Sequence, residues 1–252
     1  MAYHYIWLAW SSAFLVPWLL LHALVPRQRR EMLWASVFTA PFGLTEPLFV
    51  PAYWNPPSLF DLAQRTGFDI ESLIFTFAIG GVGSVLYNVI TGKRVEAVPA
   101  AEHSRHRHRW HRAALATPFV VFPVLLPFRW NPIYPGILAM AAGALAAAAC
   151  RPDLKAKTLI GGLLFLGYYF VFMEALNILA PGYIEQVWNL PALSGLLVLG
   201  VPVEELLFGL AFGMYWAGVY EHFTWARAIA SERRQAPSKE HAAAVQRSGG
   251  SS

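Results

Sequence analysis

The sequence predicts an all-α polytopic membrane protein, with seven transmembrane helices arranged as two parallel three-helix repeats joined by a linker helix. Three observations predict this architecture. Hydrophobic residues make up 56% of the 252 residues and only 13% are charged, against roughly 25% charged residues in a soluble domain. The charges gather in short polar stretches between apolar runs long enough to cross a bilayer. Two of these runs also resemble each other in sequence.

The apolar runs define the expected spans when each is ended at its flanking charges. They lie at 3–26, 32–54, 69–91, 113–128, 133–150, 158–180 and 202–220. We therefore divide the chain into repeat 1 at 1–91, a basic inner loop with linker span 4 at 92–132, repeat 2 at 133–222, and a polar cytoplasmic tail at 223–252. The tail ends in Gly and Ser, a composition typical of a mobile extension.

Lysine and arginine predict the orientation, because basic loops resist translocation across the membrane. If the N-terminus lies outside, the inner side receives 17 of the 19 basic residues, and the outer side keeps only Arg65 and Arg129. We therefore expect an integral membrane protein, in a bacterial inner membrane, with its N-terminus outside and its C-terminus in the cytoplasm. No basic residue precedes the first span and three arginines follow it, so it does not have the pattern of a cleavable signal peptide.

An internal repeat connects the two halves of the chain. GFDIESLIFTFAIGGVGSVLY at 67–87 aligns without gaps on GVPVEELLFGLAFGMYWAGVY at 200–220, with seven identities that include Glu71 and Glu204. Upstream, Trp54-Asn55 matches Trp188-Asn189. With the predicted orientation, spans 1–3 and 5–7 run in the same direction, so the pseudo-axis lies along the membrane normal. A site built from both repeats is expected between them.

Ionisable residues inside a membrane span are costly, so each one is a functional hypothesis. The sequence places five carboxyl groups in the spans: Glu46, Glu71, Glu174, Glu204 and Glu205. With a rise of about 1.5 Å per helical residue, Glu46 and Glu174 lie roughly 20 to 25 Å above the inner face. Spans 3 and 7 enter from the outer side and carry their acids in the first turn. All five are therefore expected in one layer, in the outer half of the bilayer.

The expected chemistry of this layer is proton donation. No basic residue lies within a span to pair with the acids, and burial without a cation raises the pKa of a carboxyl group. Neutral carboxylic acids in an aromatic cavity are proton donors, and aromatic faces stabilise a carbocation. The helix dipole alone accounts for single acids in a first turn, but not for Glu46 and Glu174. Since Glu204 and Glu205 are about 100° apart on their helix, one is expected to face the cavity and the other to bond a neighbouring helix.

These motifs resemble the membrane-integral, flavin-independent lycopene cyclases of the heterodimeric or fused type. The repeated unit of that family has an acid near the end of its second span, then Trp, then Pro-x-Glu-Glu and an apolar helix containing Phe. The second half of this chain matches with Glu174, Trp188 and PVEELLF at 202–208, and the first half with Glu46, Trp54 and DIESLIF at 69–75. Two departures from the family pattern are that Glu46 and Glu174 stand where the family usually has Asp, and that repeat 1 has Asp69 and Ser72 in place of the Pro and the second Glu.

The resemblance implies a redox-neutral, acid-catalysed cyclisation of a linear polyene end group, such as that of lycopene. It implies catalytic roles for the acids of the motifs, Glu204 and Glu205 with Glu174, Glu46 and Glu71 in support. The aromatic residues around them are the expected substrate-binding residues: Trp54, Trp188, Phe75, Phe208 and Tyr169. The expected partners are an apolar polyene and the lipid bilayer, with anionic lipids at the inner face and no nucleic acid. Homo-oligomeric and hetero-oligomeric assembly both remain open.

No cofactor and no metal ion are expected. GGVGS at 80–84 is inside a span, where it is typical of close helix packing rather than of nucleotide binding. HSRHRHRWH at 103–111 offers metal ligands, but its arginines at the inner face are typical of a contact with anionic head groups. Cys150 is interpreted as a small packing residue.

Other classes of seven-span protein fit less well. A retinal-binding photoreceptor needs a lysine within a helix, and the lysines are expected in loops or in the tail. A double-Glu membrane metalloprotease needs a cationic residue and histidine ligands near its Glu pair, but Gly209 stands where an arginine would be expected, and His4 and His22 are expected near opposite faces of the membrane. The alternative that stays open is a non-catalytic carotenoid-binding or polyprenoid-binding assembly protein.

Overall fold

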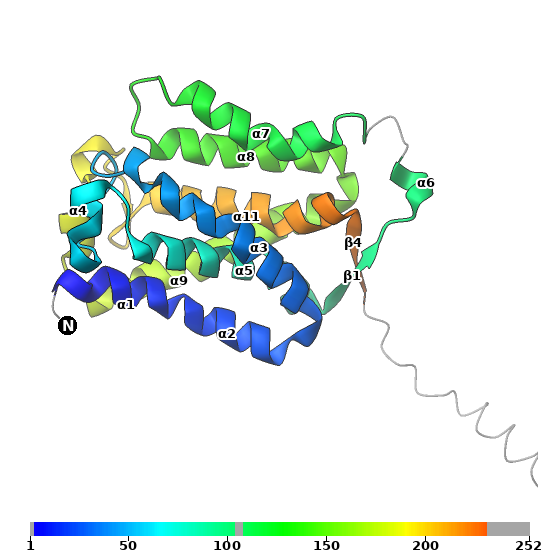
Figure 1. Ribbon diagram of the computed structural model, residues 1–252, viewed down its shortest axis with the longest axis horizontal. Coiled ribbons are helices and arrows are strands. Elements are labelled where there is room, and N and C mark those ends of the chain that lie inside the picture. The colour runs from blue at the N-terminus through cyan, green and yellow to red at the C-terminus, as the bar shows by residue number, and fades with distance from the viewer. Residues whose placement is uncertain (1–2, 104–107, 231–252) are drawn as a thin grey trace, which may run out of the picture.

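The computed structural model describes residues 3–103 and 108–230, and these residues are mostly helical (Figure 1). The long helices and the helical segments that continue them are α1 (Ile6–Ala13), α2 (Leu15–Leu24), α3 (Arg29–Thr39), the 3₁₀ segment η3 (Ala40–Leu48), α5 (Ile70–Thr91), α7 (His111–Leu125), α8 (Ile133–Cys150), α9 (Lys155–Leu179) and α11 (Val203–Thr224). Short elements lie between them: α4 (Leu62–Thr66), α6 (Ala100–His103), α10 (Tyr183–Val187), β1 (Lys93–Ala97), β2 (Leu197–Val198), β3 (Val201–Pro202) and β4 (Ala226–Ala230).

Helices α5 and α11 pack against each other in the bundle. Figure 1 shows α7 and α8 side by side along one edge, and α1 and α2 along the opposite edge. The side chain of Asp69 caps α5 by accepting a hydrogen bond from the amide of Ser72, and Gly92 ends the helix in a left-handed conformation with φ 65°. A buried apolar and aromatic core connects α1, α5, α8, α9 and α11.

Proline interrupts two of the expected spans. In the first span, α1 ends at Ala13 and α2 begins at Leu15, because Pro17 cannot donate a hydrogen bond to the carbonyl group four residues earlier. In the second, the α-helix ends at Thr39 and continues as 3₁₀ helix over Ala40–Leu48, a stretch that contains Pro41 and Pro47. We expect Glu46 in an α-helix from the sequence, but it lies in a 3₁₀ segment.

The two halves of the chain pair with each other at both ends of the bundle. At one end β1 and β4 form an antiparallel pair in which Val95 lies opposite Ala228. At the other end Trp54 and Trp188 form an isolated antiparallel bridge. The amide of Asn55 donates to the carbonyl oxygen of Val187 at 2.8 Å, and the amide of Asn189 donates to that of Tyr53 at 2.9 Å.

Strands β1 and β4 correct two expectations. Residues 92–112 were expected to be a loop and linker, and 223–230 part of a polar tail, but these stretches contribute the two paired strands. The remainder of the expected tail, 231–252, lies outside the described residues. A strand pair of this kind joins segments far apart in the chain, so it depends on tertiary structure rather than on the local sequence pattern.

The glycines of the stretch 80–84 allow close helix packing, which confirms that expectation. A Cβ atom added to Gly80 would overlap the side chain of Thr39 on α3, and one added to Gly81 would overlap Trp18 and Ser36. At Gly83 it would lie 3.2 Å from the ring of Phe212 on α11. Small residues therefore hold α5 close to both halves of the bundle.

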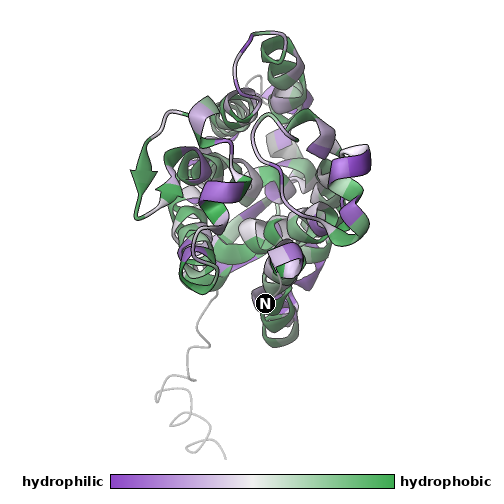
Figure 2. Cartoon of the chain, turned by 90° about the vertical axis from the view of Figure 1, so that its left-hand side faces the viewer, coloured by the Kyte–Doolittle hydropathy of each residue, from purple (hydrophilic) through white to green (hydrophobic). Residues whose placement is uncertain are grey.

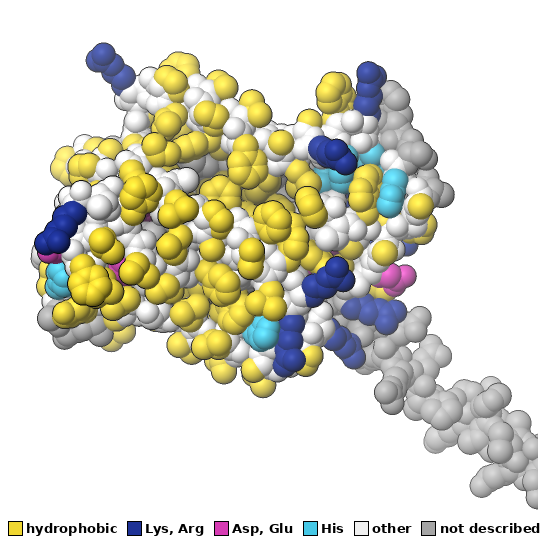
Figure 3. Space-filling model, in the orientation of Figure 1, with side chains coloured by type: hydrophobic (Ala, Val, Ile, Leu, Met, Phe, Trp, Pro, Cys, Tyr) yellow, Lys and Arg dark blue, Asp and Glu magenta, His cyan; other side chains and the backbone are white. Residues whose placement is uncertain are grey.

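Within the described residues, four helical stretches are long and apolar enough to cross a membrane: Tyr3–Leu24, Ile70–Thr91, Ile133–Cys150 and Pro152–Leu179. The shorter helix His111–Leu125 is also apolar. Hydrophobic side chains cover the middle of the face in Figure 3, and charged side chains gather toward its two ends. The end-on view in Figure 2 likewise shows hydrophobic ribbon over much of the bundle. The chain has the surface of a membrane protein.

A buried polar cluster lies where α3, α5, α9 and α11 meet. Lys157 forms ion pairs with Glu221 and, at 3.2 Å, with Glu31. Asn88 donates hydrogen bonds to both carboxyl groups at 3.1 and 3.2 Å. Lys157 was expected in a loop; it lies instead in the first turn of α9, because that helix begins three residues before the expected span. Its pairing with two acids makes it a structural cation of the bundle.

Candidate active site: an aromatic cavity with two carboxyl groups

A cavity of about 560 Å³ lies inside the bundle, between the two halves of the chain. Residues from α1, η3, α5, α7, α8, α9 and α11 line it, and nearly all of them are apolar or aromatic. All five of the expected substrate-binding residues belong to this lining: Trp54, Trp188, Phe75, Phe208 and Tyr169. A cavity of this size and composition suits an apolar ligand.

Glu205 is the acid of the Glu204–Glu205 pair that lines the cavity. Its Oε1 accepts hydrogen bonds from the hydroxyl group of Tyr53 and, at 2.7 Å, from the indole nitrogen of Trp188. Its Oε2 accepts a hydrogen bond from the hydroxyl group of Tyr169 at 2.5 Å. Three donors from three segments therefore fix the orientation of one carboxyl group at the cavity wall.

Glu46 is the second acid in the cavity lining. The indole nitrogen of Trp54 donates a hydrogen bond of 2.5 Å to its Oε1. Ser72, which takes the place of Glu205 in the sequence alignment of the repeats, also lines the cavity. Each half of the chain thus contributes one carboxyl group and one tryptophan that holds it, although the two carboxyl groups come from different points of the repeat.

Glu204 lies outside the cavity lining and holds two neighbouring segments. Its Oε1 accepts hydrogen bonds of 2.8 Å from the hydroxyl group of Tyr134 on α8 and from the amide of Ser194. This is the division of roles expected from the 100° between Glu204 and Glu205.

Glu71, which aligns with Glu204, makes an equivalent contact in the first half. Its Oε1 accepts a hydrogen bond of 2.7 Å from the amide of Leu59. Glu71 and Glu204 therefore each tie the loop that precedes their helix to its first turn.

Glu174 does not join the other acids at the cavity. It is half-buried on α9, and the cavity is lined from that helix by Tyr169, Met173 and Leu176. Those three residues follow the spacing of one helix face, and Glu174 is rotated by about 100° from Met173. Of the five acids expected to converge, Glu46 and Glu205 reach the cavity.

Two tyrosines important to the site were not singled out from the sequence. Tyr53 contacts Glu205 across the two halves, but its counterpart in the Trp-Asn alignment is Val187, so the repeat gives no signal for it. Tyr134 reaches Glu204 from α8, a contact that only the packing reveals.

In the loop beyond the spans, the ring of Tyr183 packs edge-on against Trp188, and burial raises the pKa of its hydroxyl group well above the ordinary value.

The charge of the cavity wall is restricted to the two carboxyl groups, since no lysine, arginine or histidine belongs to its described lining. Such a site can move a proton to or from an apolar molecule. The surrounding rings of Phe75, Phe208 and Tyr169 present π faces that stabilise a cation in the absence of a counter-ion. The arrangement therefore suits acid–base chemistry on a hydrocarbon.

Part of the chain matches a known protein family. Residues 131–223 match a protein family described as lycopene cyclase. This segment contains α8, α9, α11, Trp188 and Glu205. No curated protein and no solved structure matches the chain. The second half of the chain, over residues 131–223, is therefore similar to the lycopene cyclase family.

Proposed function

We propose that the protein is a carotenoid cyclase that closes a ring at the end of a linear, lycopene-type polyene. The observation that carries this proposal is that Glu46 and Glu205 line one aromatic cavity, in a chain with a lycopene cyclase family domain. The cavity joins a carboxyl group from each half of the chain, and each half provides the tryptophan that orients its own acid.

The proposed reaction adds one proton and removes one, so it is redox-neutral. A carboxylic acid protonates the terminal double bond of the polyene, which leaves a carbocation. A neighbouring double bond attacks this cation and forms the ring carbon–carbon bond, which moves the positive charge into the ring. Loss of a proton from an adjacent carbon then restores a double bond. The first step of this reaction requires a general acid, and the last step requires a general base.

We assign proton donation to Glu46 and proton acceptance to Glu205. Three hydrogen-bond donors converge on Glu205, and donors of this kind stabilise a carboxylate more than a carboxylic acid. Trp54 donates a hydrogen bond to one oxygen of Glu46, and fewer donors converge on this carboxyl group than on that of Glu205, so the protonated form is less disfavoured at Glu46. The carboxylate of Glu205 also stabilises the positive charge that develops during ring closure.

The remaining three acids, Glu204, Glu71 and Glu174, support the cavity in this proposal without contacting the polyene. Glu204 and Glu71 fasten the loops at Ser194 and Leu59, which close the outer end of the two repeats. Glu174 lies on α9, outside the cavity lining. We assign all three to support of the cavity rather than to contact with the polyene.

We propose that the polyene reaches the cavity sideways from the lipid. Several residues of the cavity lining are also exposed on the apolar surface between η3 and α7, among them Phe42, Leu48 and Phe119. A long hydrocarbon can place its end group in the cavity while the rest of the chain stays in the bilayer. We further propose a parallel two-repeat arrangement of seven spans, which the paired segments at both ends of the bundle support. The distribution of basic residues places the cavity acids toward the outer side in this proposal.

Expression in bacteria that accumulate lycopene tests the proposal. The wild type is expected to yield cyclised pigment, and Glu46→Gln or Glu205→Gln is expected to lower the yield by about 100-fold or more. Glu185→Gln is the matched control, because Glu185 is an exposed glutamate outside the cavity. Unaltered lycopene that copurifies with well-inserted wild-type protein would instead indicate a carotenoid-binding protein and would contradict the enzyme.

A further inference from the structure

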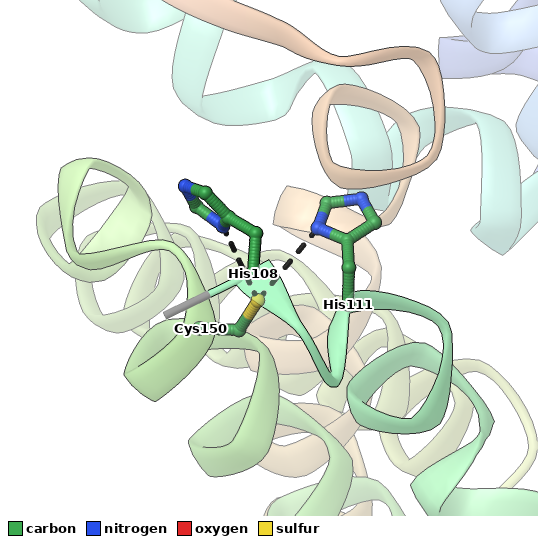
Figure 4. Close-up of side chains that lie close together, drawn as sticks. All are labelled: His108, His111 and Cys150. Carbon is green, nitrogen blue, oxygen red and sulfur yellow. Dashed lines mark hydrogen bonds between the residues drawn. The ribbon is translucent and has the colours of Figure 1, made fainter. Parts of the chain in front are cut away.

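A second cluster of reactive side chains lies beside the paired strands β1 and β4, outside the cavity lining. His108, His111 and Cys150 are all buried, and their candidate ligand atoms lie within 4.8 Å of one another. The sulfur atom of Cys150 lies 3.6 Å from Nδ1 of His108 and 3.6 Å from Nδ1 of His111. Figure 4 shows the three side chains close together: His108 just before α7, His111 at its start and Cys150 at the end of α8.

Backbone contacts fix the tautomer of one of these histidines. Nε2 of His111 lies 2.8 Å from the carbonyl oxygen of His222. A carbonyl oxygen can only accept, so Nε2 carries the hydrogen and Nδ1 of the neutral ring presents its lone pair toward Cys150. His222 returns the contact, since its Nε2 donates to the carbonyl oxygen of His111 at 3.2 Å. A metal-binding imidazole is commonly oriented in this way, by a hydrogen bond from its other nitrogen.

The two sulfur–nitrogen distances fit a metal site. Zinc–sulfur bonds of about 2.3 Å and zinc–nitrogen bonds of about 2.0 Å in a tetrahedral site place sulfur and nitrogen about 3.5 Å apart. Both sulfur–nitrogen distances in the cluster are 3.6 Å, close to this value. A thiol has a single proton and can donate it to one imidazole at a time, whereas a cation between the three atoms satisfies both nitrogens and a thiolate together.

We propose that His108, His111 and Cys150 bind a zinc ion. Two imidazole nitrogens and one thiolate form a donor set that suits Zn²⁺ and disfavours Ca²⁺ or Mg²⁺, which prefer oxygen ligands. Three protein ligands leave the fourth position of a tetrahedral site to water. The sequence analysis expects no metal ion, so this site differs from that expectation. Cys150 lies far from the two histidines along the chain, at the end of α8, and the fold brings the three side chains together.

The surroundings permit an ion to reach and occupy the site. A surface cavity of about 470 Å³ is lined by His108, His111 and Trp225, and by exposed Arg109 and Arg112 at its rim. The neighbouring cation Arg151 is paired with Asp153 at 2.6 Å, so its charge is balanced locally. The ring of Trp225 stacks on that of His111 with centroids 3.9 Å apart and supports the ligand from behind.

The bound ion would fasten the linker helix α7 to the lycopene cyclase family domain. Cys150 belongs to the matched segment 131–223, and His108 and His111 precede it. Because His111 is also bonded to His222 at the end of α11, the ion would tie together α7, α8 and α11. This is a structural site that is separate from the carboxyl groups of the cavity.

Metal analysis of the full-length chain tests this site. The protein is produced with added zinc, purified in detergent through a tag that contains no histidine, and assayed by elemental mass spectrometry. We expect about one zinc ion per chain, and a loss of about tenfold or more in Cys150→Ser and His111→Ala. His103→Ala is the matched control: His103 also stacks on Trp225, but its Nε2 lies 3.2 Å from the carbonyl oxygen of Val98.

Cobalt substitution of the wild type gives an answer that does not depend on how the variants fold. A Co²⁺ ion bound by Cys150 would show a thiolate-to-cobalt charge-transfer band and the strong visible bands of tetrahedral cobalt. Wild-type protein without zinc and without these bands would overturn the proposal. Equal zinc content in the wild type and in folded Cys150→Ser would overturn it as well.

Discussion

Trp54 and Trp188 face each other across a backbone bridge between the two halves of the chain, and each donates its indole hydrogen to a different carboxyl group of the cavity. Their rings are tilted against each other with centroids 5.3 Å apart. One contact therefore sets the positions of Glu46 and Glu205 together. A shift of either tryptophan changes the geometry of both acids.

The first prediction concerns the indole hydrogens. Trp188→Phe keeps an aromatic ring in the cavity wall but removes one of the donors to Glu205. A hydrogen bond to a charged group contributes about 1.5–3 kcal/mol, so we expect cyclase activity to fall by roughly 10- to 100-fold. Trp54→Phe is expected to lower activity through Glu46. Trp130→Phe, at an exposed tryptophan outside the cavity, is the control. Equal activity in wild type and Trp188→Phe would contradict the role of this donor.

The second prediction concerns the loop held by Glu204. Glu204→Ala removes the acceptor for the amide of Ser194 and for the hydroxyl group of Tyr134. We expect faster hydrogen exchange at Ser194 and a loss of about 2 kcal/mol in stability. Hydrogen exchange with mass spectrometry and thermal unfolding in detergent measure the two effects, with Glu185→Ala as the control. Unchanged exchange in the loop would show that Glu204 does not hold it.

The third prediction concerns the buried ion pairs of Lys157. Lys157→Met leaves Glu31 and Glu221 buried without their cation. Breaking a buried pair from one side costs about 3–5 kcal/mol, so the melting temperature in detergent is expected to drop strongly. Lys155→Met, at an exposed lysine two residues earlier in α9, is the control. The triple variant Lys157→Met, Glu31→Gln, Glu221→Gln is expected to recover part of the loss, and the absence of any recovery would argue against electrostatics as the cause.

The fourth prediction concerns orientation. Reporter fusions are made after His103, in the basic inner stretch, and after Asn189, in the loop between α10 and α11. A phosphatase that is active only outside the cytoplasm is expected to be active after Asn189 and inactive after His103. A cytoplasmic fluorescent reporter is expected to give the opposite pattern. The reverse result for both reporters would place the cavity acids toward the inner side.

The sequence predicts the cavity lining well because its aromatic residues flank the acids of the repeated motifs. Trp54, Trp188, Phe75, Phe208 and Tyr169 all line the cavity. Depth along a helix was also sufficient to associate Glu46 with Glu205. Helix depth does not give the direction of a side chain, however, and this is why Glu174 was expected in a cavity that its helix face does not reach.

Other features depend on contacts between distant segments and have no local signal. The pairing of β1 with β4 joins residues more than a hundred positions apart, and neither KRVEA nor ARAIA alternates strictly between polar and apolar residues. Tyr53 and Tyr134 reach the two acids of α11 only through packing. The buried partners of Lys157 are found on α3 and α11, so its role was not visible at the start of its own helix.

The most direct test of the central claim is to follow the proton itself. The purified enzyme is given lycopene in detergent or lipid made up in D₂O, and the cyclised product is examined by mass spectrometry. A cavity carboxylic acid exchanges its proton with the solvent, so in D₂O it donates a deuteron to the polyene, and a different proton leaves when the ring closes. We therefore expect each ring to gain one deuterium in the wild type. Glu46→Gln is expected to form no labelled ring. Rings that form without deuterium, or at the wild-type rate in Glu46→Gln and Glu205→Gln, would contradict acid–base cyclisation by this pair.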